Sequence, residues 1–173
     1  KQEFLNGNYS KSILLASKIN TFESMIFLSR TISIHTNFFK KGDLAKENYL
    51  KAYDISKQAL LINENNSSAY TEAAHSLGRY GQEIGIMSAI TEGIAARVKT
   101  YLDKALNLDS NNIIANLSKG IWHAEIVNQA GKILAGVMYG AEPETARLHF
   151  NKVILMNSDD IHDQIAILYE LSY

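Results

Sequence analysis

The sequence predicts an all-α protein built from stacked antiparallel helix hairpins, and three observations support this prediction. A nine-residue phrase occurs three times, starting at Gln58, Lys104 and Lys152, so the separations are 46 and 48 residues. Each copy joins an apolar stretch to a cluster of asparagine, aspartate or serine, which is typical of a helix end and the turn after it. Elsewhere, apolar residues recur at spacings of three and four. The chain has one proline, Pro143, which suits long helices because proline disrupts helix interiors.

We expect about eight helices in a single domain that covers residues 1–173. Their expected ranges are 8–19, 21–38, 43–62, 67–87, 90–107, 113–138, 143–156 and 159–172. A helix hairpin of this kind cannot bury its own apolar face and must stack on its neighbours. The expected units are residues 1–20, 21–62, 66–108 and 112–156, followed by a capping helix at 159–172.

Start and stop signals justify the boundaries in chain order. Gly42 and Asp43 offer a helix stop followed by an N-cap before the helix at 43–62. The polar clusters at 65–68 and 109–112 contain short side chains that cap the helices after them. Pro143 lies in the first turn of the helix at 143–156, where proline is tolerated. The last helix, at 159–172, is expected from its apolar residues, Ile165, Ile167, Leu168 and Leu171.

The helix expected at 113–138 is long and contains three glycines. Gly120, Gly131 and Gly136 each cost up to about 1 kcal/mol relative to alanine in a helix interior. We expect close approach of a neighbouring helix to compensate for them, with a kink as the alternative.

Composition excludes several classes of protein. The net charge of −1 argues against a nucleic-acid-binding protein, which normally carries a basic face. No apolar run is long enough to span a membrane. Without cysteine there is no disulfide framework and no thiolate chemistry, and this absence fits either redox environment. The chain starts at Lys1, as expected of a trimmed chain or of a mature form that has lost a signal sequence.

The motifs of common enzymes and metal sites are missing. No two of the five histidines are spaced to share a helix face, so we expect no metal site; they are His35, His75, His123, His149 and His162. The acidic cluster at 159–163 is expected to cap a helix. No P-loop, nucleophile elbow or dinucleotide fingerprint occurs. We therefore expect no catalytic residues, no cofactor and no enzymatic activity.

The phrase at 104–112 resembles the end of a tetratricopeptide repeat, with Ala105 at the small position and Ser110 in place of the usual proline. Its period is longer than the 34 residues of that family. Residues 68–156 are also similar to divergent tetratricopeptide proteins of bacterial envelopes, including the T-component of TRAP-type transporters. The markers are Leu77-Gly78-Arg79, Gly120 to Glu125 and Tyr139-Gly140-Ala141. The resemblance implies a right-handed superhelix and a periplasmic or envelope location, with the cytoplasm as the alternative.

The same resemblance implies that the first helix of each unit lines a concave groove. The residues expected in this groove are Thr71, His75, Arg79, Ile121 and Glu125. Arg79 and Glu125 lie 46 residues apart, at equivalent positions of successive units, so we hypothesise that they face each other across the groove. The alternative is an exposed pair that contributes little.

Two kinds of binding are expected, and the transporter resemblance implies the second. The first is a non-enzymatic scaffold that holds a protein segment or peptide on its concave face. The second is a periplasmic accessory protein of a transport system that holds a small organic ligand between repeats, with contacts between subunits of a homo-oligomer. The pocket residues of this second reading are Trp122, His123, Met138 and Tyr139. A purely structural role for Trp122 and His123 is the further alternative.

Overall fold

The computed structural model describes residues 1–156 and residue 164, and this part of the chain forms ten helices. The N-terminal half contains α1 (Gln2–Leu5), α2 (Tyr9–Ala16), α3 (Phe22–Phe39), α4 (Asp43–Ile62) and α5 (Ser67–Ile84). The C-terminal half contains α6 (Ile86–Thr91), α7 (Ile94–Leu108), α8 (Ile113–Ala130), α9 (Lys132–Tyr139) and α10 (Pro143–Leu155). The all-α class is confirmed. The expected helix at 159–172 lies outside the described residues.

Glycines with positive φ account for α6 and α9, two of the helices that the sequence did not predict as separate elements. Gly85 (φ 92°) ends α5, Gly93 (φ 72°) precedes α7, and the short α6 lies between them. Gly131 (φ 75°) divides the long helix expected at 113–138 into α8 and α9. Glycine adopts a positive φ without the steric cost that other residues carry. An α-helix cannot continue through a residue with positive φ. The single helix expected at 113–138 is therefore wrong, because the chain breaks at Gly131 into two helices.

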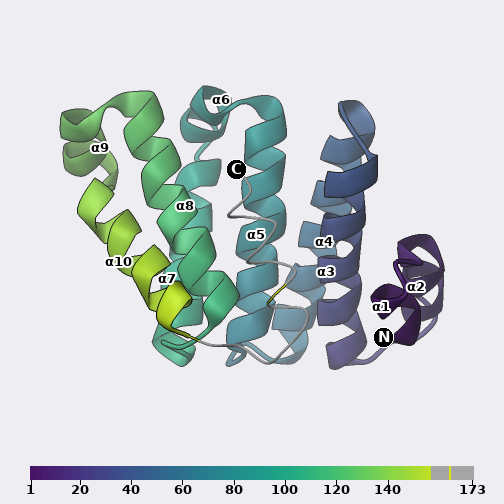
Figure 1. Ribbon diagram of the computed structural model, residues 1–173. Coiled ribbons are helices and arrows are strands. Elements are labelled where there is room, and N and C mark those ends of the chain that lie inside the picture. Colours follow the sequence, from purple (N-terminus) through teal and green to yellow (C-terminus); the bar gives the residue numbers. More distant parts are fainter. Residues whose placement is uncertain (157–163, 165–173) are drawn as a thin grey trace.

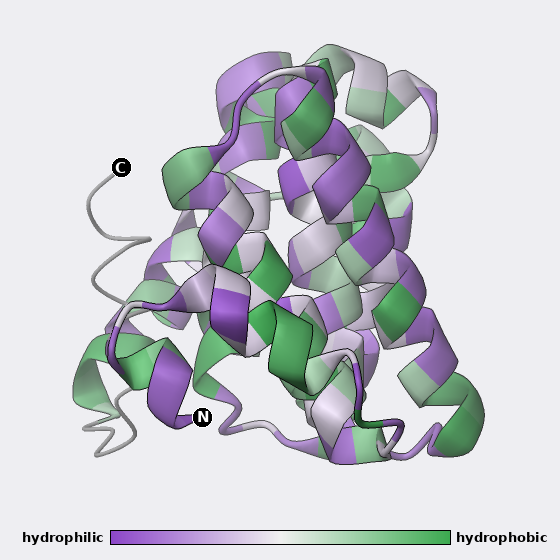
Figure 2. Ribbon diagram, turned by 90° about the vertical axis from the view of Figure 1, so that its right-hand side faces the viewer, coloured by the Kyte–Doolittle hydropathy of each residue, from purple (hydrophilic) through white to green (hydrophobic). Residues whose placement is uncertain are grey.

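The helices lie side by side in a row of hairpins (Figure 1). α3 packs on α4, α5 on α7, and α8 on α10, while α5 also contacts both α3 and α8. α1 and α2 lie at one end of the row and α9 and α10 at the other (Figure 1). Figure 2, which faces the α1–α2 end, shows hydrophobic and hydrophilic stretches alternating along the helices, as expected of amphipathic helices whose apolar sides meet.

The repeated phrase encodes the same turn twice. Asn66 and Asn112 cap α5 and α8, and each side chain accepts a hydrogen bond of 2.9 Å from the backbone N–H three residues later. The preceding C-caps, Asn63 and Asp109, each accept a hydrogen bond from the N–H two residues later, at 3.0 and 2.9 Å. Short polar side chains satisfy backbone donors that the helix start leaves unpaired. The polar clusters therefore act as the caps that the sequence predicts.

The same turns also connect successive hairpins. The Asn112 amide donates to the Ser67 hydroxyl at 2.9 Å, and this hydroxyl donates to the Ala105 carbonyl at 2.8 Å. The start of α5 is thus tied to the end of α7 and to the cap of α8. These bonds fix the axial register between neighbouring units.

Gly120 permits the close contact between α8 and α10. A Cβ atom at this position would lie 2.6 Å from Cε1 of Phe150, closer than real Cβ contacts come. The expectation that a glycine in this stretch allows close helix approach therefore holds at Gly120. Gly136 differs, since a Cβ there would meet nothing within 4 Å among the described residues.

We predict opposite effects of filling these two glycines. Gly120→Val should destabilise the protein by about 1–3 kcal/mol, because the new side chain overpacks the contact with Phe150. Gly136→Ala should stabilise it by up to about 1 kcal/mol, because alanine loses less backbone entropy in a helix. Urea unfolding of both variants tests this. Equal effects would show that the Phe150 ring moves aside at little cost.

Candidate functional site

The candidate site is an open pocket lined by four helices. α5 and α8 form its two sides, α7 its floor, and α6 closes one end. The floor is apolar and includes Ile94, Ala95 and Val98. The volume of the pocket is about 80 Å³, well below the roughly 300–1,000 Å³ of typical small-molecule sites. The space is of the order of a single side chain.

Small residues on α5 create this hollow. A Cβ at Gly81 would lie 3.1 Å from Cβ of Ala89 and 3.4 Å from Cγ2 of Ile94, so this glycine brings α5 close to α6 and α7. At Gly78 the nearest atom would be Cγ1 of Val98, at 3.9 Å. Gly78 and Gly81 thus have a packing role within α5.

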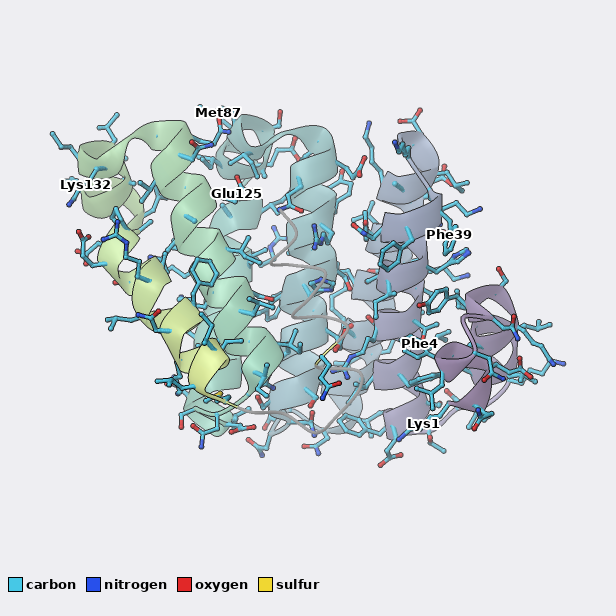
Figure 3. All side chains as sticks on the ribbon, viewed as in Figure 1. Lys1, Phe4, Phe39, Met87, Glu125 and Lys132 are labelled. Atoms are coloured by element: carbon cyan, nitrogen blue, oxygen red, sulfur yellow. The ribbon has the colours of Figure 1, made fainter. Side chains whose placement is uncertain are left out.

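The rim of the pocket is polar. Arg79 is only 6% exposed, and its guanidinium donates to the Gln82 side-chain oxygen at 3.0 Å. The Gln82 amide donates in turn to the Glu125 carboxylate at 3.5 Å, the upper limit for a hydrogen bond. Glu125 lies near the end of α8 that approaches α6 (Figure 3). Arg79 and Glu125 therefore share one rim, with Gln82 between them.

Four of the five residues expected in the groove line this pocket. They are His75 and Arg79 from α5 and Ile121 and Glu125 from α8. Thr71 does not line it; this residue is fully buried, and its hydroxyl donates to the Ser67 carbonyl at 2.8 Å. Gln82 was missing from the expected set, although it lies one helical turn after Arg79. Helical spacing alone therefore contained a signal for it.

The residues expected to hold a small ligand do not gather in one pocket. Trp122 lines the pocket between α5 and α8, and its indole N–H donates to the Ala95 carbonyl at 2.8 Å. His123 instead accepts a hydrogen bond from the Glu142 N–H through Nδ1, at 3.1 Å. Met138 is 65% exposed, and Tyr139 packs partly buried against the core. The break at Gly131 separates the last two residues from the pocket.

A second buried polar cluster joins α7, α8 and α10. Lys119 is 5% exposed, and its ammonium forms an ion pair with Asp103 at 2.6 Å and lies 5.2 Å from the Trp122 ring centre. The rings of His123 and His149 stack with their centres 6.2 Å apart, and His149 Nδ1 lies 3.0 Å from the Asn116 side-chain oxygen. No group of three His, Cys, Asp or Glu side chains within residues 1–156 and 164 is arranged to hold a metal ion.

Burial favours the uncharged forms of His123, His149 and Lys119, whereas hydrogen bonds keep Asp103 ionised. Burial, followed by the positive charge of Lys119, lowers the pKa of His123 to about 4. Burial likewise lowers the pKa of His149 and that of Lys119. Burial raises the pKa of Asp103, but hydrogen bonds from Lys119 and Lys99 outweigh it, so the net pKa falls. His123 is therefore neutral near pH 7, as its role as an acceptor at Nδ1 requires.

We predict that acid destabilises the protein through His123. Its folded pKa of about 4 lies below the ordinary value of 6.5, so its contribution to stability is present above pH 6.5 and is lost as the pH falls toward 4. Protonation of Nδ1 would also remove the acceptor of the Glu142 N–H. The expected slope approaches about 1.4 kcal/mol per pH unit for one proton. Urea unfolding between pH 7 and 4.5 measures it.

The matched variant for this prediction is His123→Asn, which keeps an acceptor near the position of Nδ1 but does not titrate in this range. Its stability should fall less steeply with pH than that of the unmodified protein. An unchanged slope would assign the acid sensitivity to other groups.

Comparison with known protein families assigns the chain to one of them. The family model described as "Regulator of microtubule dynamics protein 1-3" matches residues 4–163. The chain belongs to this family. No curated protein matches it at a significant level. Within the described residues, no helix is long and apolar enough to cross a membrane.

The family assignment corrects the resemblance found in the sequence. Membership of the tetratricopeptide family, and of the TRAP T-component family, is wrong. The misleading feature was the phrase at 104–112, whose small residue and polar cluster serve a helix end and an N-cap. Such features are expected in any array of helix hairpins. The periplasmic and bacterial-envelope location rested on the same resemblance and loses its support.

Proposed function

We propose that this chain is a non-enzymatic interaction module that binds a segment of a partner protein in the pocket between α5 and α8. We further propose that this binding serves the regulation of microtubule dynamics after which the family is named. The observation that carries the proposal is the combination of an apolar floor with a rim that holds Arg79, Gln82 and Glu125.

The size of the pocket supports a protein partner. A volume of about 80 Å³ accepts one apolar side chain. In protein interfaces, a few side chains buried in such pockets contribute most of the binding energy. The rim carries both signs of charge together with an amide. Such groups can pair with the backbone and polar side chains on either side of an inserted anchor, which gives specificity more than affinity.

The test uses purified tubulin and microscopy of single growing microtubules. The unmodified protein is expected to change the growth rate or the frequency of catastrophe. Glu125→Arg should reduce this effect at least fivefold, because it reverses the charge on the rim. The matched control is Glu47→Arg, the same substitution at an exposed residue of α4, which should behave like the unmodified protein.

Circular dichroism of each variant checks that the fold is retained. Failure of the unmodified protein to change dynamics would contradict the microtubule part of the proposal. An effect of Glu125→Arg equal to that of Glu47→Arg would contradict the assignment of the site.

A further inference from the structure

A second surface lies at the α1–α2 end of the row of helices, away from the pocket between α5 and α8 (Figure 1). An open groove of about 580 Å³ runs between the start of α2 and the end of α3. Tyr9, His35 and Phe39 supply its rings, and Lys11 and Lys40 supply its charges. Phe39 projects from α3 on the side of the molecule where α1 and α2 lie (Figure 3). None of these residues lines the pocket between α5 and α8.

The rings form a continuous, supported cluster. Phe39 lies 6.1 Å from Tyr9 and 5.3 Å from His35, measured between ring centres. Tyr9 is held in turn by Phe4, which is 2% exposed and packs edge-on at 5.2 Å. The outer face of the cluster remains accessible, since Phe39 is 61% exposed. Because buried Phe4 holds Tyr9 in place and Phe39 is exposed beside it, this cluster is suited to pack against another aromatic side chain.

Positive charge surrounds these rings. Lys40 and Lys41 form no ion pair within residues 1–156 and 164, and Lys11, although paired with Glu3 at 2.6 Å, is 62% exposed at its side chain. Burial, followed by the charge of Lys40, lowers the pKa of His35 and so favours its neutral form. Lysines at the end of α3 also complement the helix dipole. That role does not account for the exposed Phe39 beside them.

We propose that this groove binds an acidic segment of another protein that carries an aromatic side chain. The aromatic ring stacks on Tyr9 and Phe39, and the flanking carboxylates face Lys11 and Lys40. The proposal commits to an acidic partner because of this charge complementarity. It goes beyond the function proposed for the pocket between α5 and α8 and involves a different surface.

The experiment measures fluorescence anisotropy of a labelled synthetic peptide that contains glutamates on both sides of one central phenylalanine. The full chain is expected to bind it, and affinity should fall at least tenfold when all glutamates are replaced by glutamine or the phenylalanine by alanine. Raising the salt concentration should weaken binding, since exposed charges are screened. Equal affinity for the glutamine peptide, or no binding of the acidic one, would overturn the proposal.

Protein variants locate the site. Phe39→Ala and Lys40→Glu should each weaken binding of the acidic peptide at least fivefold. Lys51→Glu, at an exposed residue of α4, is the matched control and should retain the original affinity. Phe39 is largely exposed, so its loss is not expected to unfold the chain. Binding of a single-stranded oligonucleotide is the remaining test. If it binds as tightly as the peptide and Phe39→Ala abolishes this binding, the assignment of a protein partner is overturned.

Discussion

Arg30→Ala is expected to destabilise the protein by about 3–5 kcal/mol, because it leaves the carboxylate of Glu72 buried without this partner. Two guanidinium nitrogens of Arg30, Nε and one terminal NH2 group, lie 2.7 Å from the same oxygen of Glu72. The Glu72 side chain is 2% exposed and that of Arg30 25%. The pair connects α3 to α5, the helix that contacts both neighbouring hairpins. Urea unfolding at pH 7 measures the loss.

Two further variants separate the ion pair from the space that it fills. The double variant Arg30→Met with Glu72→Leu should be less destabilised than Arg30→Ala alone, because no charge then stays buried. The exposed pair Lys57–Asp54, at 2.8 Å, supplies the control. Lys57→Ala should cost no more than about 1 kcal/mol, as surface ion pairs contribute little. A loss below about 1 kcal/mol for Arg30→Ala would show that water reaches the Glu72 carboxylate.

Trp122→Ala is expected to lower the free energy of unfolding by a similar amount, about 3–5 kcal/mol, because it leaves a cavity in the core. The indole is 6% exposed, belongs to the main core cluster and connects α8 to α7 through its hydrogen bond to Ala95. Its removal leaves a cavity next to the pocket and takes away the ring beneath the Lys119 ammonium. Far-ultraviolet circular dichroism must follow unfolding, because Trp122 is the only tryptophan of the chain.

Trp122→Phe isolates the hydrogen bond from the bulk of the ring. It should cost about 1–2 kcal/mol, because the Ala95 carbonyl loses its donor while most of the apolar contact remains. Leu61→Ala is the control for apolar truncation, since Leu61 is 89% exposed and its loss should change stability by no more than about 0.5 kcal/mol. A small loss for Trp122→Ala would mean that neighbouring side chains collapse into the space.

The two proposed surfaces differ in what each can recognise. The pocket between α5 and α8 is small and mixed in charge, so it suits a single anchor with polar neighbours. The groove at Tyr9 and Phe39 is wide, aromatic and positively charged, so it suits an acidic segment. Because they lie at separate places along the row, variants of one surface serve as additional controls for the other.

Several elements followed from local sequence. α4 spans Asp43–Ile62, the range that the apolar spacing predicts, although its N-cap is Gly42 and not Asp43 as expected. Asn66 and Asn112 cap the helices that follow them, because a short polar side chain before an apolar period is a local feature. The hypothesis that Arg79 and Glu125 face each other rested on their equivalent places in successive units, and the structure connects both side chains to Gln82. Each of these inferences needs only a few neighbouring residues or the repeat period.

Other features depended on contacts between distant residues. The three glycines expected in one long helix differ in what surrounds them: Gly120 admits Phe150, Gly131 breaks the helix, and a Cβ at Gly136 would meet nothing within 4 Å in the part of the chain that the structure describes. Adjacent Trp122 and His123 point to different neighbours, since successive helix positions face different directions. The family was also misassigned, because the phrase at 104–112 describes a helix end and a turn, and the markers at 77–79 and 120–125 lie within α5 and α8, rather than identifying a particular lineage.

The sequence by itself determined the helical class, most helix boundaries, the caps of α5 and α8 and the equivalence of Arg79 with Glu125. These properties depend on hydrophobic period and backbone capping, which act over a few residues. Tertiary structure alone decided that α6 and α7 complete the pocket, that Gln82 joins its rim, and that Tyr9 meets Phe39 from another helix. Such contacts join residues far apart in the chain, and their geometry exists only once the helices have packed.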